Sequence, residues 1–221
     1  MPMKPTAWTA LGLVLALLGP GTIALLSMQL TRGPISLGAD APWLGAFAGL
    51  VALVAAIAIL GEGLKPADVG FGRMTMASVP SAIVLALFFI LVFGPAASWA
   101  LVQFGFGSFD AGQRLFAVLP AWYLCLTVVV VAAGEEWLYR GYAIERLQAL
   151  TGSTWIAGGV SLLLFAVAHL PVWGLAVSLT TLVSGGIMTA LYLWRRDVSF
   201  LMLAHVITDL YGLVIAPLSR A

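Results

Sequence analysis

Long apolar stretches, separated by short polar segments, follow one another along most of the chain. A helix that crosses a bilayer needs about 20 mostly apolar residues, because the hydrocarbon core is about 30 Å thick and a helix rises about 1.5 Å per residue. Lipid offers no hydrogen-bond partner to the backbone, so such stretches indicate helices and not strands. We therefore predict an all-α, polytopic bundle of about seven transmembrane helices, at residues 8–28, 43–61, 78–102, 117–142, 154–170, 172–194 and 198–216.

Two points of organisation follow from this pattern. Residues 1–116 form a set of N-terminal transmembrane helices, and residues 117–216 form a second helical unit that carries most of the unusual polar side chains. The fifth and sixth stretches meet at Pro171 with almost no loop, which predicts either a very tight turn or one broken element.

Composition agrees with a membrane location. Of the 221 residues, 62% are apolar and only 9% are charged, whereas soluble domains carry about 25% charged residues. A water-soluble globular domain and a disordered chain are both excluded. The net charge of +1 gives no reason to expect a nucleic-acid partner. The single cysteine, Cys125, excludes an intrachain disulfide and a cysteine-cluster metal site.

The distribution of basic residues predicts the orientation. The side that holds the N-terminus carries seven basic residues, which are Lys4, Lys65, Arg73, Arg140, Arg146, Arg195 and Arg196. The other side carries three, which are Arg32, Arg114 and Arg220. Because cytoplasmic loops are enriched in Lys and Arg, the first side and the N-terminus are predicted to face the cytoplasm.

One cluster of ionisable residues lies where the fourth apolar stretch ends. Glu136 and Arg140 are four residues apart on a helix and can form an ion pair. Glu135 projects about 100° away from Glu136, which leaves its carboxylate for another purpose. The alternative interpretation is an ordinary surface Glu–Arg pair at a helix end that reaches the cytoplasm.

Two further clusters lie inside the fifth and seventh stretches. His169 stands four residues after Phe165, and His205 stands four residues before Asp209. Asp209 lies about 11 residues into its span, roughly 16 Å deep at 1.5 Å per residue. An ionisable group at that depth costs roughly 2.5–3.5 kcal/mol on insertion scales, which indicates a functional role. Glu, His and Asp are side chains that bind zinc or activate water.

The three clusters resemble the motifs of the CPBP family of intramembrane proteases, which includes CAAX prenyl endopeptidases and bacteriocin-processing or self-immunity proteins. The matching motifs are Glu135-Glu136-x-x-x-Arg140, Phe165-x-x-x-His169 and His205-x-x-x-Asp209, in the family's order. The resemblance covers about residues 117–216. It implies hydrolysis of a peptide bond of a membrane-associated protein or peptide, within the lipid bilayer. A prenylated CAAX-type protein is one such substrate, although the family's prenyl-processing members usually carry Asn where this chain has Asp209.

The resemblance also implies roles for individual residues. Glu135 would activate the attacking water with the help of His169, and His205 and Asp209 would stabilise the oxyanion or help to hold a metal. Glu136, Arg140 and Phe165 would support the site. Zinc stays open as a cofactor, with Glu135, His169 and His205 as three ligands and one free position. In that case Glu136 or Asp209 would have to serve as the base.

Three matters stay open at this point. By helix rise, His169 lies roughly 22 Å from the predicted cytoplasmic face and Glu135 only about 10 Å. The fourth span must therefore begin or end elsewhere, or the fifth span must start outside the hydrocarbon. Gly158-Gly159 and Gly185-Gly186, with Thr180, Thr181 and Ser184, are interpreted as close helix packing. The rival functions are a transporter or channel with a Glu/His/Asp relay, and a non-catalytic immunity or binding protein.

Overall fold

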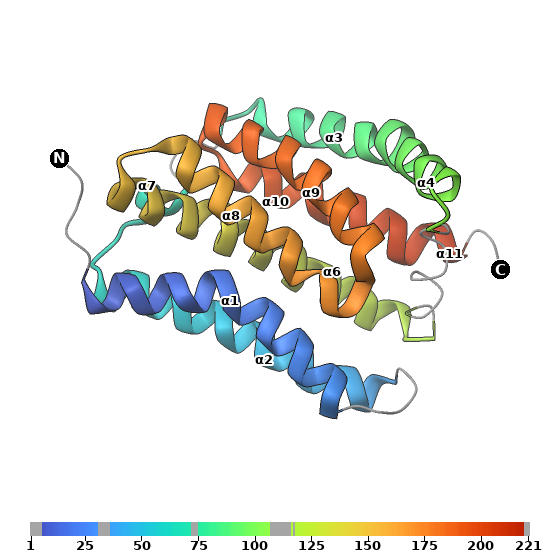
Figure 1. Cartoon of the computed structure of the whole chain (residues 1–221), viewed down its shortest axis with the longest axis horizontal. Coiled ribbons are helices and arrows are strands. Elements are labelled where there is room, and N and C mark those ends of the chain that lie inside the picture. Colours follow the sequence, from blue (N-terminus) through green and yellow to red (C-terminus); the bar gives the residue numbers. More distant parts are fainter. Residues whose placement is uncertain (1–5, 31–35, 72–74, 107–115, 117, 219–221) are drawn as a thin grey trace.

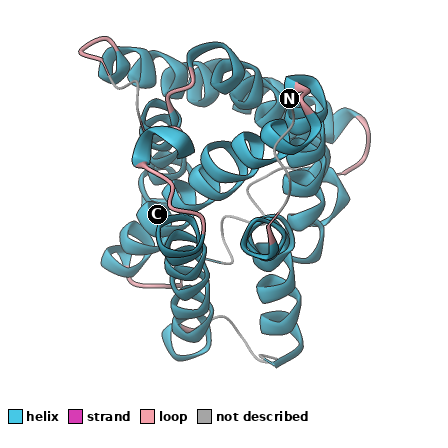
Figure 2. Cartoon of the chain, turned by 90° about the vertical axis from the view of Figure 1, so that its left-hand side faces the viewer, coloured by secondary structure: helices cyan, strands magenta, loops and turns pink. Residues whose placement is uncertain are grey.

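A computed structural model describes residues 6–30, 36–71, 75–106, 116 and 118–218, and within these it contains helices and no strand. The predicted all-α class is thus confirmed (Figures 1 and 2). The helices are α1 (Ala7–Leu30), α2 (Leu37–Ala56) with η1 (Ile57–Gly61), η2 (Pro66–Val69), α3 (Ser78–Phe88) with η3 (Phe89–Phe93) and α4 (Gly94–Gln103), α6 (Ala121–Glu135) with η4 (Glu136–Ile144) and α7 (Glu145–Thr151), α8 (Thr154–Ala168), α9 (Leu170–Arg195), and α10 (Val198–Leu210) with η5 (Tyr211–Ile215) and α11 (Ala216–Leu218).

Six of these continuous helices in the described chain are long and apolar enough to cross a membrane. They span Ala7–Leu30, Leu37–Gly61, Ser78–Gln103, Ala121–Thr151, Leu170–Arg195 and Val198–Ile215. The fifth predicted span corresponds to α8, which has only 15 residues. The chain is an integral, multi-pass membrane protein.

Two boundaries differ from the prediction for local reasons. The second helix begins at Leu37 and not at residue 43, because Ser36 caps it by accepting a hydrogen bond from the Ala39 backbone N–H. The fourth helix continues nine residues past the predicted end at Tyr142. It ends where Gly152 adopts a left-handed conformation with φ 70° and donates its N–H to the carbonyl of Gln148.

A tight turn, and not a single broken helix, joins the fifth and sixth predicted segments. α8 ends at Ala168 and α9 begins at Leu170, with His169 at the junction. The two helices then pack side by side in opposite directions, so that Gly158 of α8 lies against Leu193 of α9. The backbone of α9 is also interrupted at Gly174, where φ is 73° and ψ is −179°, a conformation that is essentially restricted to glycine.

The bundle is built around the fourth helix. α1 and α2 lie on one side of it and α3 and α4 on the opposite side, with α8, α9 and α10 between them (Figure 1). Every residue of η4, from Glu136 to Ile144, is buried. η4 is π-helical, a form that occurs mostly as short insertions within α-helices and frequently at functional sites.

Some predictions from the sequence fall outside the described part of the chain. Among the residues used to predict the orientation, these are Lys4, Arg32, Arg73, Arg114 and Arg220.

Candidate active site

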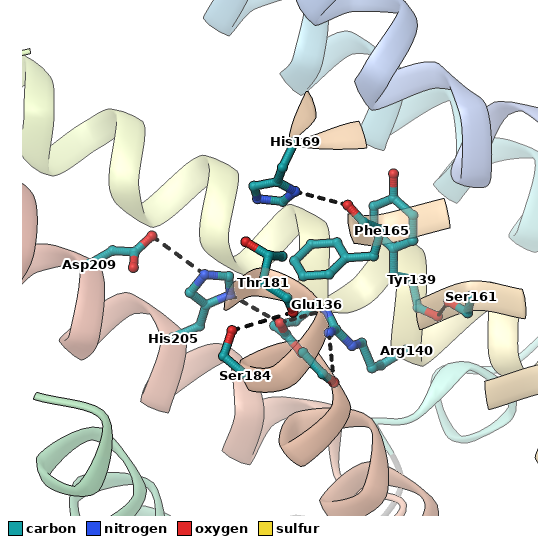
Figure 3. A network of polar contacts seen from close by, with 11 residues as sticks. Glu136, Tyr139, Arg140, Ser161, Phe165, His169, Thr181, Ser184, His205 and Asp209 are labelled. Carbon is teal, nitrogen blue, oxygen red and sulfur yellow. Dashed lines mark hydrogen bonds and ion pairs between the residues drawn. The ribbon is translucent and has the colours of Figure 1, made fainter. Parts of the chain in front are cut away.

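The first and third motifs meet at one buried carboxylate. Oε1 of Glu136 accepts a hydrogen bond from Nη1 of Arg140 at 2.9 Å and another from Nδ1 of His205 at 3.0 Å (Figure 3). Glu136 is 0% exposed and Arg140 is 1% exposed. The pair is therefore fully buried, and it is not the surface pair of the alternative interpretation. The hydrogen bond from His205 to Glu136 connects η4 to α10.

Arg140 extends this network to α8 and α9. Its Nη2 donates to the carbonyl of Gly185 at 3.3 Å, and its guanidinium lies 4.1 Å from the centre of the Phe165 ring. The Phe165 ring in turn contacts the rings of His169, at a centroid distance of 4.8 Å, and Tyr139, at 5.0 Å. Phe165 thus separates the buried cation from the His169 imidazole, as Figure 3 shows.

The tautomer of His169 follows from its only hydrogen bond to the described residues. Its Nδ1 lies 2.9 Å from the carbonyl oxygen of Phe165. A carbonyl only accepts, so Nδ1 carries a proton and donates it. In the neutral ring Nε2 then has a free lone pair, and it can accept a hydrogen bond from water. His169 is half-buried, so that nitrogen is not sealed in the core.

Glu135 differs sharply from its neighbour Glu136. Its side chain forms no hydrogen bond or ion pair with any residue in the described parts of the chain, and it is half-buried. The charged or titratable groups within electrostatic range of it include His169, His205, Asp209 and Glu136. Both imidazoles thus lie within electrostatic range of Glu135, and no residue of the described chain forms an ion pair with its carboxylate.

His205 lies between two carboxylates. Nδ1 faces Glu136, and Nε2 lies 3.4 Å from Oδ2 of Asp209. Two acceptors on the two nitrogens match an imidazolium, in which both nitrogens donate. The contact with Asp209 is longer than a normal hydrogen bond, so this N–H stays available to a nearer acceptor. Asp209 and His205 are both half-buried.

The extended fourth helix removes the difference in depth between Glu135 and His169. Glu135 lies 16 residues before Thr151, which corresponds to about 24 Å along the helix. His169 lies 15 residues after Thr154, or about 22 Å. Because α7 and the start of α8 are adjacent, the two side chains reach nearly the same level. The predicted end of the fourth span at Tyr142 was the source of the discrepancy.

The described side chains contain no preassembled set of zinc ligands. Within the described residues, no group of three or more His, Cys, Asp or Glu side chains is placed to hold a metal ion. Glu135, His169 and His205 are therefore not assembled as a metal-binding set in the described part of the chain, and no step of the mechanism below uses a metal.

Sequence analysis missed the contribution of α9 to the site. Gly185 does lie in close helix packing, since an added Cβ would come within 3.1 Å of Arg140 Nη2 and of Leu162. Thr181 stands four residues before Gly185, on the same face of α9, and Ser184 directly precedes Gly185. Both belong to the polar network in Figure 3. The spacing of one helical turn between Thr181 and Gly185 was the signal available in the sequence.

Comparison with known proteins agrees with this geometry. Residues 117–211 match the family model described as type II CAAX prenyl endopeptidase, Rce1-like. The matched segment contains Glu135, Arg140, His169, His205 and Asp209. No curated protein and no solved structure shows a significant match to the chain. The family processes membrane-associated proteins, in agreement with intramembrane protease activity. Residues 117–211 of this membrane protein are thus similar to the Rce1-like type II CAAX prenyl endopeptidases.

Proposed function

We propose that the chain is an intramembrane endopeptidase that hydrolyses a peptide bond with water activated by Glu135. One observation carries the proposal: Glu135 is a carboxylate without a partner in the described chain, and His169 is among its electrostatic neighbours. A general base must be free to accept a proton and must lie near the reacting water. Glu136, which is already bound by Arg140 and His205, does not meet the first condition.

The first step is addition of water to the scissile carbonyl. Nε2 of His169 accepts a hydrogen bond from the water and orients it. Nε2 is free to accept because the ring proton is on Nδ1, which donates to the carbonyl of Phe165. Glu135 removes a proton as the water oxygen bonds to the carbonyl carbon. The product is a tetrahedral intermediate with a negatively charged oxygen.

The second step needs stabilisation of that oxygen and a proton for the leaving group. The Nε2–H of His205 donates to the oxyanion, with Glu136 and Asp209 on either side of the ring to hold its positive charge. Protonated Glu135 then gives its proton to the amide nitrogen. The C–N bond breaks, and a carboxylic acid and an amine are released.

Glu136, Arg140 and Phe165 act by holding these groups in place. Glu136 fixes the orientation of His205 through Nδ1, and Arg140 holds Glu136 against α9 through the carbonyl of Gly185. Phe165 supplies the carbonyl that sets the tautomer of His169. These roles explain why a buried ion pair lies directly behind the reacting groups.

The substrate in this proposal is a membrane-associated protein or peptide, with a prenylated CAAX-type protein as the specific candidate. We further propose that the end of the bundle with α7 faces the cytoplasm. Lys65, Arg146, Arg195 and Arg196 lie on the segments at that end, in keeping with the enrichment of basic residues in cytoplasmic loops.

The test is cleavage of a fluorogenic farnesylated CAAX-type peptide by the full chain in liposomes. We expect Glu135→Gln to reduce kcat about 10²–10⁴-fold, the range attributed to general base catalysis. Asp68→Asn, at an exposed residue outside the site, should leave kcat unchanged. Wild-type activity in the folded Glu135→Gln variant would refute the proposed base.

Metal removal gives a second, independent measurement. Because the described side chains do not form a metal-binding set, dialysis against a chelator should leave kcat unchanged. Loss of cleavage on chelation, restored by zinc, would contradict the mechanism. Proton flux through the same liposomes without peptide hydrolysis would favour a relay function, and neither activity would favour a non-catalytic binding role.

A further inference from the structure

We propose that the hydroxyl of Thr181 on α9 is a second donor to the oxyanion, beside the Nε2–H of His205. The inference rests on the proposed peptidase function and adds a residue to that site. Neither the motifs nor the family comparison points to this position, since Thr181 lies between the second and third motifs. It is inferred from the contacts of the surrounding side chains.

The site lacks a second donor among the motif residues. Stabilisation of an oxyanion depends on preorganised donors directed at the developing charge, and single donors contribute large rate factors. Asp209, when ionised, only accepts hydrogen bonds. Nδ1 of His205 is already used by Glu136, and Nδ1 of His169 by the carbonyl of Phe165. Arg140 has further N–H groups, but the Phe165 ring lies between its guanidinium and the His169 imidazole. Nε2 of His205 is thus the donor that the motif residues offer on the His169 side of that ring.

Contacts of the same helix place Thr181 at the site. Arg140 binds the carbonyl of Gly185, which stands one turn after Thr181 on the same face of α9. In Figure 3 the side chain of Thr181 lies between the rings of His169 and His205, and its oxygen is directed toward the space between them. That space is where the water and the scissile carbonyl must meet in the proposed mechanism.

The other Ser and Thr hydroxyls of α9 show what distinguishes Thr181. Ser178, Thr180 and Ser184 each lie within hydrogen-bond distance of a backbone carbonyl of their own helix. The Thr189 hydroxyl also has no hydrogen-bond partner in the described chain, but Thr189 is buried, with its Cγ2 packed towards Gly158. Thr181 is half-buried, and its hydroxyl forms no hydrogen bond with any residue in the described chain. Because a hydroxyl rotates about its C–O bond, it can turn its proton toward an oxyanion.

The experiment compares two adjacent threonines with the same substitution. Thr181→Val removes the hydroxyl and keeps the branched shape, whereas Thr181→Ser keeps the hydroxyl. Thr180→Val is the matched control, because the Thr180 hydroxyl donates to Val177 of its own helix. All are assayed with the fluorogenic peptide in liposomes, with folding checked by circular dichroism and size-exclusion chromatography. If Thr181→Val does not fold, Thr181→Ala replaces it under the same criteria.

We expect Thr181→Val to lower kcat about 10²-fold with little change in KM, as for the loss of one oxyanion donor. The kcat of Thr181→Ser should stay within a few-fold of that of the wild type, and the kcat of Thr180→Val should equal that of the wild type. A kcat for Thr181→Val within a few-fold of wild type would overturn the inference. An equal loss of kcat in Thr180→Val would also overturn it, because the loss would then come from disturbed helix packing and not from a missing donor. If the wild type cleaves and Glu135→Gln does not, such a failure affects Thr181 alone and leaves the proposed function intact.

A second variant pair tests the reason for the requirement. Asp209→Asn supplies a side-chain N–H that can donate where the carboxylate cannot. In the Asp209→Asn background we therefore expect Thr181→Val to cost less than about 10-fold in kcat. An undiminished loss in that background would show that the two positions do not serve the same oxyanion, which contradicts the inference.

Discussion

At the scale of single residues, the two adjacent glutamates have opposite environments, and this difference is the basis of the separate roles that we propose for them. Oε1 of Glu136 is shared by Arg140 and His205, and its Oε2 has no hydrogen-bond partner in the described chain. A buried carboxylate of this kind depends on its cations, because an uncompensated charge in a low-dielectric interior is costly. Glu135 lies one residue earlier and forms no hydrogen bond or ion pair with the described residues.

Arg140→Gln tests this dependence. Removal of one partner of a buried ion pair typically costs about 3–5 kcal/mol, so we expect the free energy of unfolding to fall by about that amount. Arg195→Gln is the control, since Arg195 is half-buried and stacks on Phe200, a contact that contributes at most about 1 kcal/mol at such a site. Denaturant unfolding in detergent micelles measures both. Equal, small losses would mean that Arg140 does not compensate Glu136.

At the scale of secondary-structure elements, the sequence predicted the helices and the local pairs well, and it failed where distant partners decide. Apolar stretches located the seven helices, and the spacing of Glu136 and Arg140 predicted their ion pair. The fourth helix was predicted to end at Tyr142 because polar residues follow. It continues because Glu145 pairs with Arg196, and Arg146 lies near Glu62.

The same limit applied to the site. The sequence predicted that Glu135, His169 and His205 converge, because a function was assigned to them together. It could not show that Glu136 holds His205, since these residues are 69 positions apart and their contact depends on the packing of η4 against α10. Thr181 on α9 was missed for a similar reason, because the role that we propose for it depends on the elements that pack opposite it.

Gly185→Ala tests the close approach of α9 to the site. An added Cβ would lie 3.1 Å from Arg140 Nη2 and 3.2 Å from Phe165 Cδ1, so both side chains must shift. Overpacking of this kind costs about 1–3 kcal/mol, and we expect lower stability together with reduced kcat. The matched control is Gly159→Ala on α8, where an added Cβ meets nothing within 4 Å. Wild-type kcat in Gly185→Ala would show that this contact does not position the site.

At the scale of the whole molecule, a second polar cluster joins the N-terminal helices to the unit that carries the site. Glu62, at the end of η1, accepts hydrogen bonds from Thr9 of α1 at 2.8 Å and from Tyr142 of η4 at 2.5 Å. Arg146 lies 3.9 Å from the same carboxylate. Elsewhere along the fourth helix, the hydroxyl of Tyr123 on α6 donates a hydrogen bond to Asp40 of α2 at 2.7 Å. The Tyr139 hydroxyl also donates to the Leu17 carbonyl of α1 at 3.3 Å. Polar contacts therefore fix α1 and α2 to the fourth helix at three separate places in the described chain.

Tyr142→Phe tests whether this connection stabilises the fold without taking part in the chemistry. The Tyr142 side chain is buried and its hydroxyl lies against Gly12 of α1, so water has little access to replace the lost donor. A hydrogen bond to a charged group contributes about 1.5–3 kcal/mol, and we expect the free energy of unfolding to fall by that amount. Tyr211→Phe, at an exposed tyrosine without a hydrogen bond to the described residues, should leave stability unchanged. At a temperature where Tyr142→Phe is folded, its kcat should equal that of the wild type, because Tyr142 lies one and a half turns beyond Glu136 and touches none of the reacting groups. A large fall in kcat with unchanged stability would instead place the Glu62 cluster in the mechanism.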